Sequence, residues 1–231
     1  MRVLFVGEGP HDIGRRDAFN PDESQRPGVV QVLARKVCSH LADDSPALRW
    51  SELARFHPDA KKRGFGAKMK AAALIAERRL GCVGIVCVTD RDRDDDRVRQ
   101  IAEGAEALRG TTRVASGIAV ESVEAWTLGA PEAIAEELGL DEKAVRQSYP
   151  GAHVEALYQN SGHLDHRPKD LVEKIADRSG REPGQEFRVR VAERTNVSRL
   201  ERACPAGFAP FAASLREAFA GAPQETDRSD S

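Results

Sequence analysis

Several acidic side chains directly follow apolar segments of the chain, in a pattern that can hold a metal ion. Glu8 follows RVLFVG, Asp90 and Asp92 follow CVGIVCVT, and Glu121 follows RVASGIAV. Three more acids stand close by in the sequence: Asp12, Asp94 and Glu124. Clustered carboxylates repel one another and raise one another's pKa values unless a cation neutralises them. Oxygen ligands favour Mg²⁺ or Mn²⁺ over zinc, so the pattern predicts a magnesium or manganese site.

The apolar segments that precede these acids are predicted strands. CVGIVCVT is apolar on both faces, as expected for a central strand covered by helices on both sides. Helical spacing of apolar residues predicts helices over 28–41 and 67–80, and a charged helix that ends near Leu108. Residues 48–56 (LRWSELARF) fit a strand and a helix almost equally well. This alternation predicts an α/β fold with a mostly parallel, Rossmann-like sheet, whose ligands bind beyond the carboxyl ends of the strands.

The chain becomes helical after Gly129. Pro131 and Pro168 are good first residues of helices, and Asp141 is a good cap. A last amphipathic helix is predicted over residues 205–220. We therefore expect three parts, namely an α/β catalytic core (1–129), a helical extension that packs on it (130–220) and a disordered tail (221–231).

The charge balance excludes a protein that coats nucleic acid by bulk electrostatics. The 231 residues carry 35 Lys plus Arg against 37 Asp plus Glu, with a sequence pI of about 6.3. Contact with nucleic acid must then depend on local patches. One candidate patch consists of Arg15, Arg16, Lys61, Lys62, Arg63, Lys68 and Lys70.

The cellular location of the protein is predicted from the N-terminal sequence and from the length of the apolar segments. The N-terminus resembles no signal peptide, and no apolar run approaches the roughly 18 residues of a membrane span. We therefore expect a cytoplasmic protein without membrane contact. The four cysteines form no metal-binding pattern and are expected to be buried thiols.

Two acidic motifs resemble the Toprim domain, the metal-dependent module of topoisomerases, primases and the OLD family of nucleases. The motifs are VGEGPHD, with Glu8 and Asp12, and VCVTDRDRD, with Asp90 and Asp92. The segments VESVEAWTLGA, PKDL and ACPAGFAPFAASL resemble uncharacterised Toprim-related families. Together these matches cover most of the chain. The resemblance implies a small stand-alone Toprim-like fold with a helical C-terminal extension, of a kind found in phage defence and mobile elements, sometimes beside an ATPase partner.

The resemblance also implies roles for individual residues. Glu8 would be the Toprim glutamate, which binds metal or handles a proton, and Asp12 would assist it. Lys169 would stabilise the charge that develops on the phosphate. The implied metal ligands are Glu8, Asp90, Asp92, Asp94 as the holder of a water, and Glu121 or Glu124. The implied activity is Mg²⁺-dependent phosphodiester hydrolysis of DNA or RNA.

Other interpretations stay open at this stage. The acids can be helix caps and surface charges, a role that fits Asp12, Asp94 and Glu121 about as well as metal binding. A non-catalytic subunit that binds a partner ATPase or nucleic acid is the main alternative to a nuclease. It predicts that Lys169 and the acids Glu121 and Glu124 point away from Glu8 and Asp90. A small-molecule phosphohydrolase is a third possibility.

Overall fold

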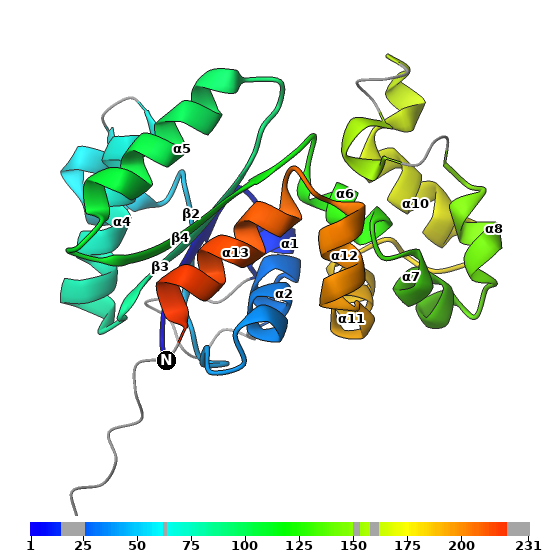
Figure 1. The fold of residues 1–231 in the computed structure, drawn as a ribbon, viewed down its shortest axis with the longest axis horizontal. Coiled ribbons are helices and arrows are strands. Elements are labelled where there is room, and N and C mark those ends of the chain that lie inside the picture. The colour runs from blue at the N-terminus through cyan, green and yellow to red at the C-terminus, as the bar shows by residue number, and fades with distance from the viewer. Residues whose placement is uncertain (15–25, 62–63, 150–152, 158–161, 221–231) are drawn as a thin grey trace, which may run out of the picture.

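A computed structural model describes residues 1–14, 26–61, 64–149, 153–157 and 162–220. Its centre is a sheet of four parallel strands, β1 (Leu4–Gly7), β2 (Ala47–Arg49), β3 (Gly84–Asp90) and β4 (Arg113–Ala119). The strands lie in the order β2-β1-β3-β4 (Figure 1). The predicted α/β fold with a parallel, Rossmann-like sheet is therefore confirmed. The tail at 221–231 lies outside the described residues.

Helices cover both faces of this sheet and also gather beyond one of its ends. They are α1 (Pro10–Ile13), α2 (Val29–Val37), α3 (Leu53–Phe56), α4 (Phe65–Leu80), α5 (Asp95–Leu108), α6 (Val123–Leu128), α7 (Pro131–Leu138), α8 (Glu142–Arg146), α10 (Pro168–Arg178), α11 (Gln185–Arg194), α12 (Val197–Ala203) and α13 (Phe208–Phe219). Short 3₁₀ turns occur at Pro58–Lys61, Val154–Ala156 and Leu164–His166. In Figure 1, α4 and α5 lie on one side of the sheet, and α2 and α13 lie on the other.

The strand β3 is buried on both faces, as its continuous apolar run predicts. Ile85 and Cys87 join the apolar core under α4 and α5, whereas Val86 and Val88 join the larger core under α2 and α13. Alternation of side chains along the strand separates the two cores. All four cysteines are buried free thiols, in line with the sequence prediction.

The ambiguous segment 48–56 contains both predicted elements. Its first residues form β2, and α3 begins at Leu53. Between them the indole N–H of Trp50 donates to the Val88 carbonyl oxygen at 3.1 Å, and the indole ring contacts Phe65 edge-on at 5.1 Å. These tertiary contacts fix the turn between β2 and α3. Neither the strand-like nor the helix-like spacing of apolar residues in this segment reveals that turn.

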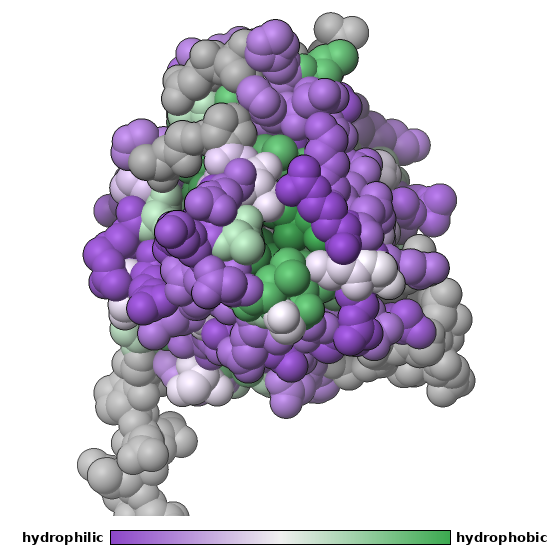
Figure 2. Space-filling view, turned by 90° about the vertical axis from the view of Figure 1, so that its right-hand side faces the viewer, coloured by the Kyte–Doolittle hydropathy of each residue, from purple (hydrophilic) through white to green (hydrophobic). Residues whose placement is uncertain are grey.

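The helices α6 to α12 gather beyond one end of the sheet, on the right of Figure 1. Figure 2 shows this end of the molecule as largely hydrophilic around a central hollow of hydrophobic side chains. The last helix, α13, returns to pack on β4 and thus belongs to the layer that covers the sheet. In the described part of the chain, no helix is long and apolar enough to cross a membrane.

The contact between α13 and β4 leaves no room for a side chain at Gly117. A Cβ atom there would lie 2.7 Å from Cδ2 and 2.9 Å from Cγ of Phe211. We expect Gly117→Ala to lower the free energy of unfolding by about 1–3 kcal/mol, the usual cost of overpacking. Urea unfolding measures this change. The control is Gly184→Ala, where a Cβ meets nothing within 4 Å, and a loss as small as that of the control would contradict the expected clash.

Candidate metal centre

The order of the strands places a crevice between the ends of β1 and β3. The chain leaves β1 for β2 on one side and later crosses to β3 on the other side of β1. Ligands of open parallel sheets bind at such a reversal, outside the carboxyl ends of the strands. Glu8 directly follows β1, and Asp90 is the last residue of β3. The topology therefore brings the first and second acidic motifs together.

An inner group of carboxylates consists of Asp12, Asp90 and Glu124. Asp90 Oδ1 accepts a hydrogen bond from the Val123 amide at 3.2 Å, and Asp12 Oδ2 accepts one from the Gly9 amide at 3.1 Å. Burial, followed by the neighbouring charges of Asp12 and Glu124, raises the pKa of Asp90 to about 9. Burial and the charge of Glu124 likewise raise the pKa of Asp12 to about 7. The inner group therefore lacks sufficient positive charge to keep all its members ionised.

An outer group contains Glu8 and Asp92, which share the guanidinium of Arg97. Arg97 Nη1 lies 3.1 Å from Glu8 Oε1 and 2.8 Å from Asp92 Oδ2, and it donates to the Asp90 carbonyl oxygen at 2.9 Å. The Thr89 hydroxyl also donates to Glu8 Oε1, at 2.5 Å. These contacts fix the two carboxylates on either side of the end of β3.

A cleft of about 1000 Å³ opens over the inner group. Its volume suits a small ligand or part of a polymer. The acids that line it are Asp12, Asp90, Asp92, Glu121, Glu124, Asp170, Glu173 and Glu182, and the cations are Arg93, Arg167, Lys169 and Arg188. Most of the cations come from the segment around α10 and from α11. The same C-terminal region also contributes Asp170, Glu173 and Glu182, so the acids from the strand ends face a wall of mixed charge.

The backbone around the cleft is strained at three positions. Within the described residues, the non-glycine residues with positive φ are Asp92 at 49°, Arg93 at 61° and Glu121 at 64°. All three line the cleft. At Glu121 the Ser122 amide donates to the Val120 carbonyl oxygen at 2.9 Å, which closes a tight turn. Such strain collects at functional sites because it aims side chains that a relaxed backbone would not place.

Glu124 forms a buried ion pair with Arg188, a residue that the sequence argument did not include. Arg188 Nη1 donates to Glu124 Oε1, and the two side chains are 7% and 12% exposed. The Nε atom of Arg188 is buried without a hydrogen-bond partner in the described structure. A charged residue within the apolar pattern of FRVRV is the sequence signal that could have indicated a buried pair.

The structure also shows where the remaining predicted residues lie. Asp94 caps α5 by accepting from the Asp96 amide at 3.0 Å, so it has the capping role that the sequence left open. Asp94 does not line the cleft, and its metal role stays a prediction. Lys169, Glu121 and Glu124 line the same cleft as Asp90 and do not point away from it.

Two further groups lie apart from this cleft. His163 and His166 contact each other edge-on, with ring centroids 5.6 Å apart. Of the candidate basic patch, Arg15, Arg16, Lys62 and Arg63 lie outside the described residues, whereas Lys68 Nζ lies over the Phe65 ring. Trp126 is fully buried and stacks on Phe211, as expected for a core residue.

The carboxylate oxygens of this site are of the kind that a hard divalent cation prefers. They are not arranged around a common point where such a cation could sit. All the candidate ligands are oxygens, the kind that Mg²⁺ and Mn²⁺ prefer. Among the described residues, no three His, Cys, Asp or Glu side chains are arranged to hold an ion together. The contacts give the reason, since Arg97 engages Glu8 and Asp92 while Asp90 is turned toward the Val123 amide.

Comparisons of the chain with protein-family models, with curated proteins and with solved structures find no match.

Proposed function

We propose that the protein is a Mg²⁺- or Mn²⁺-dependent phosphodiesterase of the Toprim type, acting as a nuclease on DNA or RNA. The observation that carries the proposal is the convergence on one cleft of three acids: Asp12 on α1, which follows β1, Asp90 at the end of β3 and Glu121 after β4. Arg167 and Lys169 line the same cleft. Glu8 does not line it, and its carboxylate is held beside it by Thr89 and Arg97. Structural capping needs a single acid at each helix, and it does not require acids from three strand ends to meet.

Hydrolysis of a phosphodiester requires a metal-activated water and a cation that meets the phosphate, and residues of this site can provide for both. When bound, a divalent cation would supply Lewis acidity and an activated water. Glu8, Asp90 and Asp92 are the residues proposed to hold it, with Glu121 or Glu124 completing the set. Asp12 has a pKa of about 7, so its carboxyl group can accept or release a proton at neutral pH.

Lys169 is the residue proposed to meet the phosphate. It is exposed, it lies in the first turn of α10, and it has no hydrogen-bond or ion-pair partner among the described residues. A mobile ammonium group at the edge of an acidic cleft can hold a phosphate oxygen that the carboxylates alone would repel. Arg167 is instead paired with Asp170 at 2.8 Å.

Cleavage assays on labelled single- and double-stranded DNA and RNA test this proposal. We expect cleavage that requires Mg²⁺ or Mn²⁺, stops with EDTA and falls by at least about 100-fold in Glu8→Gln, because the variant loses the charge that handles the cation or proton. Glutamine keeps an oxygen that can accept from Thr89, so the fold should survive. Circular dichroism and the unfolding temperature check this.

The matched control is Glu103→Gln, which changes an exposed glutamate on α5 that pairs with Arg99. It should cleave as the unchanged protein does. Equal cleavage by Glu8→Gln and the unchanged protein would contradict the proposed site. Metal binding without cleavage of any of the four substrates would contradict the nuclease proposal and favour the non-catalytic subunit.

A further inference from the structure

Arg97 occupies an unusual position for a cation. It is the third residue of α5, where the N–H groups of the first turn point toward the helix start. Positive charge at this end of a helix is unfavourable because it opposes the helix dipole. Its placement must therefore be set by other groups. Arg97 contacts the acids of the outer group, and its guanidinium carbon lies 5.9 Å from the centroid of the Phe65 ring.

A single nitrogen of Arg97 has more oxygen neighbours than it has hydrogens. Nη1 carries two hydrogens, yet Glu8 Oε1, Asp92 Oδ2 and the Asp90 carbonyl oxygen all lie within 3.1 Å of it. The Nε atom adds a fourth contact, 3.6 Å from Asp94 Oδ2. Oxygens from two parts of the chain, Glu8 and the stretch 90–94, thus surround one positive centre, which is the environment that a bound cation requires.

A second observation points to a ligand in the cleft beside this group. Arg188 is 6% exposed, lines the cleft and has a buried Nε without a hydrogen-bond partner in the described structure. Burying a donor without a partner costs about 1–3 kcal/mol. A donor needs an acceptor, so this observation favours an oxygen ligand such as a phosphate in the cleft, which is the group on which the proposed reaction acts; a cation alone would not satisfy it.

We propose that Arg97 is a positioning residue that holds Glu8 and Asp92 in the metal-free protein and competes with the divalent cation for them. This inference rests on the proposed function, because it concerns the same carboxylates. Arg97 engages Glu8 Oε1 and Asp92 Oδ2, and its positive charge repels a divalent cation that approaches them. We therefore infer that Arg97 must release these two oxygens before the cation can bind to them. Its side chain is 26% exposed, and it can therefore swing toward solvent without opening the core.

Competition between Arg97 and the metal ion predicts that the loss of Arg97 increases the affinity for the metal. Removal of a structural contact normally weakens a metal site, whereas removal of a competing cation strengthens it. The apparent affinity for the metal is reduced by the fraction of molecules in which Arg97 occupies the oxygens. We therefore expect Arg97→Gln to bind Mn²⁺ at least roughly tenfold more tightly than the unchanged protein.

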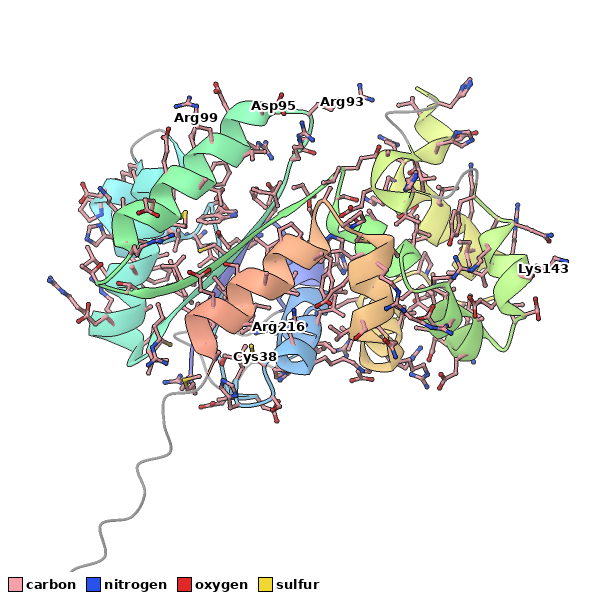
Figure 3. The ribbon with its side chains drawn as sticks, in the orientation of Figure 1. Cys38, Arg93, Asp95, Arg99, Lys143 and Arg216 are labelled. Carbon is pink, nitrogen blue, oxygen red and sulfur yellow. The ribbon has the colours of Figure 1, made fainter. Side chains whose placement is uncertain are left out.

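Electron paramagnetic resonance of free Mn²⁺, titrated into the full chain, measures this affinity without an activity assay. Arg97→Lys retains a cation and should stay close to the unchanged protein. The matched control is Arg99→Gln, which removes an arginine of the same helix that pairs with Asp96 and Glu103. Figure 3 shows Arg99 on the outer side of α5, and its loss should leave the Mn²⁺ affinity unchanged.

The unfolding temperature gives a second readout. Metal-free Arg97→Gln should unfold at a lower temperature, since Glu8 and Asp92 lose their shared cation, and Mn²⁺ should raise this temperature more than it does for the unchanged protein. Equal or weaker Mn²⁺ binding by Arg97→Gln would overturn the role of Arg97 and leave the proposed function standing. Absence of Mn²⁺ binding by both proteins would overturn the proposed function and this inference together.

Discussion

Asp90→Asn is expected to stabilise the metal-free protein at alkaline pH while it abolishes binding of the divalent cation. Burial and the charges of Asp12 and Glu124 raise the pKa of Asp90 to about 9 from an ordinary value of 3.8. The folded protein therefore retains a proton that the unfolded chain releases. Stability linked to this proton is present at acidic pH and is lost as the pH rises from about 4 to about 9.

Asparagine at position 90 has no carboxyl group to titrate, and it can keep the hydrogen bond that Asp90 accepts. Its side-chain oxygen can still accept from the Val123 amide, as Asp90 Oδ1 does at 3.2 Å. Between about pH 5 and about pH 9, the variant should lose less stability than the unchanged protein. Near pH 9 we expect a gain of at least about 1 kcal/mol, or roughly 2–4 °C in unfolding temperature for a chain of this size.

Thermal unfolding in EDTA at several pH values measures this effect, and Mn²⁺ titration measures the loss of binding. The control is Asp96→Asn, which changes an exposed acid of α5 that pairs with Arg99 at 3.0 Å. It should show no gain at alkaline pH. Equal destabilisation by Asp90→Asn at all pH values would instead indicate a structural role for Asp90 and contradict a buried carboxyl with a raised pKa that binds metal.

The sequence was sufficient for the elements that carry strong local signals. The apolar run of β3 predicts a strand buried on both faces, and the structure has this strand with Asp90 as its last residue. Proline at position 10 predicts extended geometry at Gly9, which has φ −126° and ψ 160°. In both cases the cause lies within a few residues, so the pattern is readable without knowledge of the fold.

Arg97 and Arg188 were not predictable in the same way, although Lys169, which the sequence resemblance named, does line the cleft. Arg97 stands among many arginines in RDRDDDRVR, and only the fold shows that it reaches Glu8, which is 89 residues away. Arg188 meets Glu124 across 64 residues. The turn at Glu121 is equally hidden, because a positive φ at a non-glycine residue has no local signature. Acids at strand ends therefore indicated where the site lies, whereas their counter-ions depend on tertiary packing.

The buried pair of Arg188 and Glu124 is expected to give the second large effect. Arg188→Met removes the cation and leaves Glu124 as a buried charge without this partner. The loss of one member of a buried pair costs about 3–5 kcal/mol, which is a large part of the stability of a typical domain. Urea unfolding measures the loss. The control is Arg146→Met, whose exposed pair with Glu142 should contribute less than about 1 kcal/mol.

A double-mutant cycle separates the ion pair from simple packing. Adding Glu124→Gln to Arg188→Met removes the stranded charge, so the double variant should recover part of the lost stability. The two single changes should also move the pKa of Asp12 in opposite directions, because Glu124 raises that pKa and Arg188 lowers it. Carboxyl NMR titration of Asp12 measures both shifts. Shifts in the same direction, or a double variant less stable than Arg188→Met alone, would contradict a charge balance in which Arg188 offsets Glu124 beside the carboxyl of Asp12.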